Sequence, residues 1–91
     1  MRLKVIQATL QDDSYAQRLI GRVVNDDAVT RRFAQAVYVC YDDSGRLADA
    51  GSTYTDPTDL GAGQTGTFST TIIGPRTEVA SCDVIAQATN L

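Results

Sequence analysis

The chain has 91 residues, of which 43% are hydrophobic and 21% charged, values that suit one globular domain with a modest core. Its net charge is −3 and its one tight basic pair is Arg31-Arg32, which argues against a nucleic-acid partner. No run of about 18 apolar residues is present, so we expect no membrane insertion by this segment.

Alternation of apolar with polar residues, the period of a β-strand, recurs along the chain, and no stretch has a helical period. Thr and Val are abundant, whereas Glu, which is common on helix surfaces, occurs once, at Glu78. The predicted strands span residues 1–10, 15–25, 33–41, 47–55, 64–73 and 78–89. Turns rich in Asp, Asn, Gly and Pro, including Gly74-Pro75, separate them. We therefore expect an all-β fold: an immunoglobulin-like antiparallel β-sandwich of about seven strands, in one domain that covers residues 1–91.

The first predicted strand places Leu3 and Val5 on one face and Ile6 and Ala8 on the other. Residues 33–41 are apolar on both faces, which is typical of a central strand.

Within that central strand we expect Tyr38 and Cys40 to point inward and Tyr41 to lie on the opposite face. The strand ends at an Asp-Asp-Ser-Gly turn, where the carboxylate of Asp42 can accept backbone N–H groups. The turn therefore predicts a hairpin at this point.

Residues 47–55 are more polar, so we place this strand near a sheet edge. Gly51 indicates either a bulge or a close approach of another group to the backbone. Gly21 would similarly let a large side chain, Tyr38 or Phe68, pack against the backbone of the second strand.

Catalytic residues, cofactor ligands and metal ligands are not expected. General acid-base and nucleophilic catalysis need a positioned titrating group, most often His, and the chain contains no His. We therefore predict that the protein is not an enzyme and uses no cofactor.

Cys40 and Cys82 fall at inward positions of strands that would be neighbours in an immunoglobulin-like sheet, so a disulfide between them is conceivable. A directly cross-strand bridge is strained, and a buried free Cys behaves as a small hydrophobic residue. We favour free thiols, with the disulfide as the alternative.

Acidic residues gather at turns, in the pairs Asp12-Asp13, Asp26-Asp27, Asp42-Asp43 and the looser Asp56 and Asp59. Carboxylates from loops at one end of a sandwich can converge on calcium. Turn chemistry alone also explains Asp at these positions. Calcium binding is kept as an alternative without assigned metal ligands.

Sheet edges offer a further route to interaction, because unpaired backbone groups can accept a strand from a partner or a second copy. In addition, Val37, Val39, Tyr41 and Tyr54 would form an exposed apolar patch if no other element of the domain covers them.

Several segments together resemble the FxLYD domain family. They are Leu19-Ile20-Gly21-Arg22-Val23-Val24-Asn25, Tyr38-Val39-Cys40-Tyr41-Asp42, Ser52-Thr53-Tyr54, and Leu60-Gly61-Ala62-Gly63-Gln64-Thr65 with Phe68. The resemblance implies an immunoglobulin-like sandwich from bacterial or archaeal proteins, commonly lipoproteins or membrane-anchored extracytoplasmic proteins, without an established activity. The motif residues carried over are structural: Gly21, Asn25, Tyr38, Cys40, Tyr41, Asp42, Gly45 and Phe68.

These observations lead to the prediction of a non-catalytic, extracytoplasmic interaction or spacer domain that binds a protein or a cell-envelope component. No export signal is recognisable at the start, so we expect a domain excised from a longer exported chain, with a cytoplasmic location as the alternative. Two other functions stay open: a calcium-binding adhesion-type module and a small cytosolic protein-binding or inhibitor domain.

Overall fold

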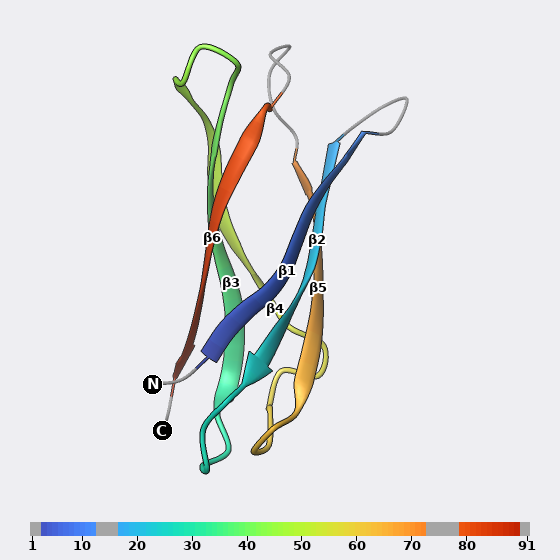
Figure 1. Cartoon of the computed structure of the whole chain (residues 1–91), viewed down its shortest axis with the longest axis vertical. Coiled ribbons are helices and arrows are strands. Elements are labelled where there is room, and N and C mark those ends of the chain that lie inside the picture. Colours follow the sequence, from blue (N-terminus) through green and yellow to red (C-terminus); the bar gives the residue numbers. More distant parts are fainter. Residues whose placement is uncertain (1–2, 13–16, 73–78, 90–91) are drawn as a thin grey trace.

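The computed structural model describes residues 3–12, 17–72 and 79–89, and every regular element in them is a β-strand (Figure 1). The strands are β1 (Leu3–Asp12), β2 (Gln17–Asn25), β3 (Arg32–Tyr41), β4 (Leu47–Tyr54), β5 (Thr65–Ile72) and β6 (Ser81–Thr89). They form two antiparallel three-stranded sheets, ordered β1-β2-β5 and β4-β3-β6. The two sheets face each other across one apolar core, which confirms the expected β-sandwich.

The strand count is six in the described residues, so the expected count of about seven was wrong. Each alternating segment of the sequence formed one strand. In a seven-stranded immunoglobulin sandwich, the strand equivalent to β6 is followed by one more strand, which pairs with its outer edge. No described segment pairs there, and β6 is an edge strand. Asp13, the Gly74-Pro75 turn and Glu78 lie outside the described residues.

Side chains from both sheets and from the connecting segments fill the core. Its buried members are Leu19, Val23, Ala34, Ala36, Tyr38, Cys40, Leu60, Phe68, Ile72 and Val79. On β2 and β3 they recur at every second residue, as the pleat requires.

β3 is the central strand of its sheet and β4 is an edge, as predicted. Tyr38 and Cys40 are buried, with 7% and 0% of their surfaces exposed, and Tyr41 is only half-buried. The backbone at Gly51 is approached closely by the Tyr38 hydroxyl, which lies 2.7 Å from the position that a Cβ atom would take.

The face assignment within β1 was wrong at Ala8. The pairing of β1 with β2 shifts between Val5 and Gln7, which leaves Ile6 as a bulged, exposed residue. One extra residue reverses the alternation, so Ala8 pairs with the inward-facing Gly21.

Candidate interaction site

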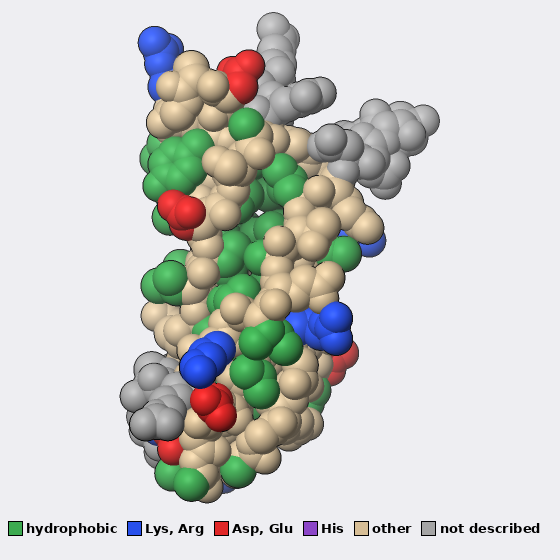
Figure 2. Space-filling view, viewed as in Figure 1, with side chains coloured by type: hydrophobic (Ala, Val, Ile, Leu, Met, Phe, Trp, Pro, Cys, Tyr) green, Lys and Arg blue, Asp and Glu red, His purple; other side chains and the backbone are tan. Residues whose placement is uncertain are grey.

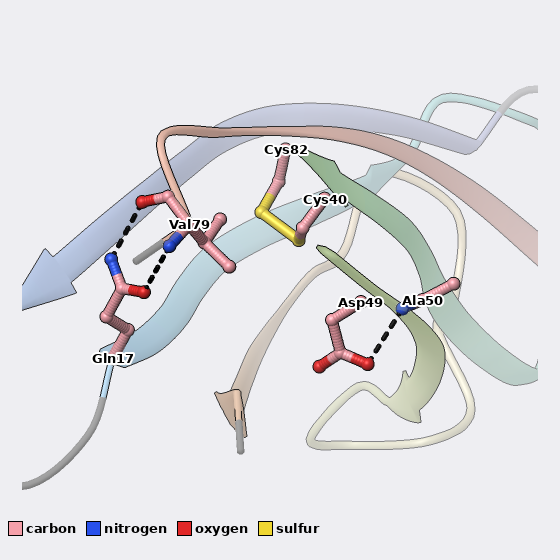
Figure 3. Close-up of a disulfide and its surroundings, with 6 residues drawn as sticks. All are labelled: Gln17, Cys40, Asp49, Ala50, Val79 and Cys82. Atoms are coloured by element: carbon pink, nitrogen blue, oxygen red, sulfur yellow. Dashed lines mark hydrogen bonds between the residues drawn. A yellow bond between two sulfur atoms is a disulfide. The ribbon is translucent and has the colours of Figure 1, made fainter. Parts of the chain in front are cut away.

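A disulfide joins Cys40 of β3 to Cys82 of β6 (Figure 3). The preference for free thiols was therefore wrong. The two residues lie directly opposite each other in the β3-β6 register, and their Cα atoms are 4.0 Å apart. In an antiparallel ladder, facing side chains come closest at pairs without mutual backbone hydrogen bonds, and Cys40 and Cys82 form such a pair. The close approach of β3 and β6 at this pair brings the two sulfur atoms together.

Beside the disulfide, the side chain of Gln17 links the two sheets. Its amide nitrogen donates to the carbonyl of Val79 over 2.8 Å, and its amide oxygen accepts from the Val79 N–H over 2.7 Å (Figure 3). The amide thus pairs with the Val79 backbone as a strand would, and it holds the entrance of β6 against β2. The sequence analysis did not identify Gln17.

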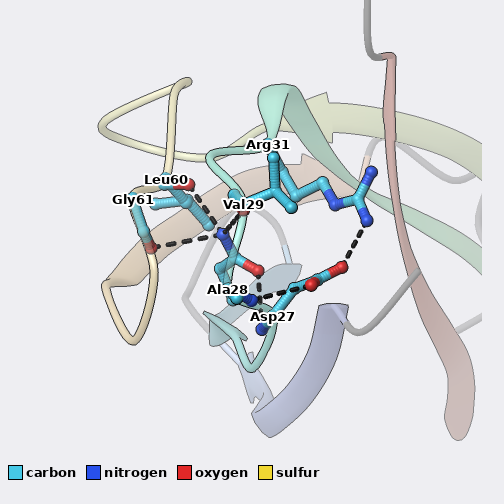
Figure 4. Close-up of polar contacts among 7 residues, drawn as sticks. Asp27, Ala28, Val29, Arg31, Leu60 and Gly61 are labelled. Carbon is cyan, nitrogen blue, oxygen red and sulfur yellow. Dashed lines mark hydrogen bonds and ion pairs between the residues drawn. The ribbon is translucent and has the colours of Figure 1, made fainter.

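Asn25, at the end of β2, is fully buried and organises the loops at that end of the sandwich (Figure 4). Its amide nitrogen donates to the carbonyls of Val29 and Leu60, each over 2.8 Å, and of Gly61 over 3.2 Å. Its amide oxygen accepts from the N–H of Asp27 over 3.1 Å. A residue proposed as part of a structural motif therefore ties the β2-β3 connection to the β4-β5 connection.

The turn after β3 is closed by the carboxylate of Asp42. One of its oxygens accepts from the N–H groups of Ser44 and Arg46, each over 2.9 Å, and from the Ser44 hydroxyl over 2.8 Å. These hydrogen bonds, first from Arg46 and then from Ser44, hold the pKa of Asp42 below its ordinary value of 3.8. Gly45 follows with a φ of 83°, in the left-handed region.

The acidic pair Asp26-Asp27 is also engaged locally. Arg31 forms an ion pair with Asp27 and, with the Ala28 N–H, lowers the pKa of that carboxyl below 3.8. Lys4 pairs with Asp26 over 3.2 Å. Within the described part of the chain, no three His, Cys, Asp or Glu side chains lie together in a group that could hold a metal ion. The geometry thus gives no support to the calcium alternative.

The outer surface of the β4-β3-β6 sheet carries a group of apolar side chains that we call the apolar face. The register places on it Val37, Val39 and Tyr41 of β3, Leu47 and Tyr54 of β4, and Ile85 of β6. Leu47, Tyr54 and Ile85 are 67%, 56% and 63% exposed, so no described element covers them. The sequence analysis named Val37, Val39, Tyr41 and Tyr54 as a patch on the condition that no other element covers them, and it did not include Leu47 and Ile85.

The outer surface of the β1-β2-β5 sheet has a different chemistry. β5 presents a row of hydroxyl groups there, from Thr65, Thr67, Ser69 and Thr71, and β2 presents Arg18 and Arg22. A hollow of about 230 Å³ lies between these strands and β1, lined by Gln7, Ile20, Gly21, Arg22, Thr67 and Phe68. It is smaller than the cavities of about 300–1,000 Å³ that hold most small ligands. This outer surface is therefore mainly polar and partly basic, with Ile6, Ile20 and Val24 among its side chains, and the apolar face carries more large apolar groups.

Apolar side chains also gather along the middle of the molecule, between the two layers, as Figure 2 shows. The partly buried residues of β1 and β6 that pack against the core are Leu3, Val5, Leu10, Cys82, Val84 and Ala86. β1 approaches β6 near the chain termini and diverges from it toward Ser81 (Figure 1). The inward face of β6 is thus only partly covered.

Comparison with solved structures finds a similar fold in a DUF1425 family member from Shewanella sp. pv-4, whose crystal structure was determined at 1.81 Å resolution. The TM-score is 0.68, with 98% of this chain and 80% of that chain covered, at 16% sequence identity. At this identity the likeness shows a shared fold alone. No protein-family profile matches the chain, and no curated protein matches it. The resemblance to the FxLYD family stays a prediction.

Proposed function

We propose that this chain is a non-catalytic interaction domain that acts outside the cytoplasm and binds a partner protein through the apolar face. The observation that carries the proposal is the exposure of Leu47, Tyr54 and Ile85 on one sheet surface, while polar side chains predominate on the opposite outer surface, where Ile6 is the exposed large apolar residue. Large apolar and aromatic side chains grouped on one surface are typical of protein-binding sites.

Charge narrows the kind of partner. The apolar face extends along β3 from Gln35 to Tyr41. Among the residues that β4 and β6 place beside this part of β3 on the same face, the charged one is Asp83. A partner should therefore offer a largely uncharged apolar surface with a Lys or Arg opposite Asp83. Rim charges of this kind contribute more to specificity and to the rate of association than to affinity.

The disulfide supports the proposed location. Disulfides form and persist in oxidising compartments and are rare in the cytosol. The Cys40–Cys82 bridge fits an extracytoplasmic domain. Among the described residues no helix is long and apolar enough to cross a membrane.

The test is a photo-crosslinking amino acid at position 54, in the cells that naturally produce the protein. The same amino acid at position 67, exposed on the opposite outer surface, is the matched control. We expect a discrete partner protein that crosslinks from position 54 alone, and that binds the purified domain at least about tenfold more weakly after Tyr54→Ala, the loss of one interface hot spot. Equal adducts from both positions, or a partner whose affinity does not change in Tyr54→Ala, would overturn the proposal.

A further inference from the structure

The four sheet edges of the sandwich are protected to different degrees. Native proteins blunt their edges with bulges, with Lys or Pro, or with side chains and loops that cover the backbone. β1 has a bulge at Ile6 and carries Lys4. β5 is covered at Thr67 by Asp56, through hydrogen bonds of 2.7 and 3.0 Å between the two backbones.

The edge of β4 is protected at one residue by a side chain. The Asp49 carboxylate accepts from the N–H of Ala50 over 2.8 Å (Figure 3). Ala50 pairs with Val39, whose backbone groups point to β6, so this N–H is one that β4 directs away from the sheet. The side chain of Asp49 therefore occupies a donor that an incoming strand would need.

β6 is the least protected of the four edges in its described residues. Its one charged residue is Asp83, it has no Lys, Arg or Pro, and the irregularity in its pairing with β3 falls on the β3 side, between Arg32 and Gln35. No described strand pairs with its outer edge. Away from the end that β1 approaches, β6 thus presents an edge to which no described strand is hydrogen-bonded.

The backbone groups available on this edge follow from the pairing of β3. The backbone carbonyl of Ala34 accepts a hydrogen bond from Thr55, on the β4 side of β3, whereas the carbonyl of Tyr41 accepts from Ala80, on the β6 side. Along a strand, the backbone N–H and C=O groups of successive residues point alternately to the two neighbouring strands. The odd-numbered residues of β3 therefore form their backbone hydrogen bonds with β6. Their partners in β6 are also odd-numbered. The N–H and C=O groups of Cys82, Val84 and Ala86 therefore point outward and are free to form a ladder.

We propose that two copies of this chain pair antiparallel through their β6 edges. The joined sheet would have the order β4-β3-β6-β6-β3-β4. The pairing goes beyond the proposed partner binding, because it uses the backbone edge of β6. Of the three most exposed residues of the apolar face it covers Ile85 and leaves Leu47 and Tyr54 on β4 exposed.

The residues of β6 are self-complementary in one register, with Ile85 opposite Ile85 of the second copy. Asp83 then faces Gln87 of the second copy, and Val84 faces Ala86. A register centred on Asp83 would set two carboxylates against each other, and one centred on Val84 would set Asp83 against Ile85. Directly opposed like charges destabilise a strand pair, and opposed β-branched residues stabilise it. The sequence of β6 therefore selects the register centred on Ile85.

Dimer formation would cover Ile85, which is 63% exposed in the single copy. It would also place the two apolar faces side by side on one six-stranded surface.

The experiment is sedimentation equilibrium of the oxidised protein up to about 1 mM, the weak end of measurable affinity. We expect a dimer, with a dissociation constant that rises at least about tenfold in Ile85→Lys, because two lysines would meet at the symmetry axis. Ser69→Lys, the same charge on the exposed surface of β5, is the matched control and should leave the dimer unchanged. Ile85 is exposed, so circular dichroism should show that Ile85→Lys keeps its fold.

A second arm tests the register. An equimolar mixture of Ile85→Lys and Ile85→Glu should dimerise again, since opposite charges then meet. A wild-type protein that remains monomeric at the highest concentration would overturn the pairing. So would a dimer that Ile85→Lys leaves intact, or variants that fail to restore each other. The crosslinking result at position 54 does not bear on this outcome, so the two proposals can fail separately.

Discussion

Gly21 of β2 lies directly opposite Phe68 of β5, and the Phe68 ring occupies the space that a side chain at position 21 would need. A Cβ atom on Gly21 would lie 2.5 Å from the ring atom Cζ and would also overlap the backbone carbonyl oxygen of Gln7. The Phe68 ring on the core side and the β1 backbone beside it thus leave no room for a side chain at position 21.

Gly21→Ala should therefore destabilise the fold. Because a paired backbone cannot retreat as a flexible side chain can, we expect a loss at the upper end of the roughly 1–3 kcal/mol range for overpacking. Urea unfolding followed by circular dichroism measures it. Gly61→Ala is the control, since a Cβ atom there would lie 3.5 Å from the Gln64 side chain, an ordinary contact. Equal stability of the two variants would contradict the packing described for Gly21.

The sequence predicted the sandwich because its alternation is a local property. Two-residue periodicity places Tyr38 and Cys40 on the inner face of β3 wherever the partner strands lie. The sequence also indicated close packing at Gly21, but it did not decide whether the ring of Tyr38 or that of Phe68 packs there. The register decides between them: Phe68 packs on Gly21, and Tyr38 packs on Gly51.

Features that depend on distant parts of the chain were not predictable. The bulge at Ile6 has no marker in the sequence of β1, and it reverses every later face assignment in that strand. The clamp between Gln17 and Val79 joins residues 62 positions apart. The disulfide was misjudged because its formation depends on how closely β3 and β6 approach at one pair of residues.

Asn25→Ala should cost about 2–4 kcal/mol of unfolding free energy, because it removes the hydrogen bonds of a fully buried amide and leaves the Val29 carbonyl without a donor, whereas the carbonyls of Leu60 and Gly61 keep the N–H groups of Arg31 and Gln64. Asn25→Asp should cost more at neutral pH, since a carboxylate cannot donate to the carbonyls of Leu60 and Gly61. Gln64→Ala is the control, because it removes an exposed hydrogen bond to Gly61 in the same loop. We expect it to cost less than about 1 kcal/mol. Urea unfolding of the three variants decides this, and an Asn25→Ala protein as stable as Gln64→Ala would contradict the role of the buried amide.

The Asp42 turn should make stability depend on pH in the acid range. The pKa of Asp42 is lowered by the N–H groups of Arg46 and Ser44, so its carboxylate stabilises the fold above the ordinary pKa of 3.8. That contribution is lost as the pH falls from there through the lowered pKa of the folded state. Asp42→Asn keeps an acceptor oxygen but removes the charge. Melting temperatures of wild type and Asp42→Asn should therefore differ most at neutral pH and converge below about pH 4. A constant difference from pH 7 to about pH 3 would show that the charge of Asp42 does not contribute.

Removing the Cys40–Cys82 bridge should destabilise the domain substantially. The bridge closes a loop over a sequence separation of 42 residues, for which chain entropy predicts a contribution of about 4 kcal/mol at 25 °C. Denatured protein alkylated without reductant should carry no label, and after reduction it should carry one on each of its two cysteines. Urea unfolding of the wild type with and without reductant then measures the bridge itself. The double variant Cys40→Ala/Cys82→Ala should be less stable than the reduced wild type, because Cys40 is fully buried and its sulfur also fills the core. Labelling of both cysteines without reductant, or unfolding that reductant does not change, would contradict the bridge and would remove the support it gives to an extracytoplasmic location.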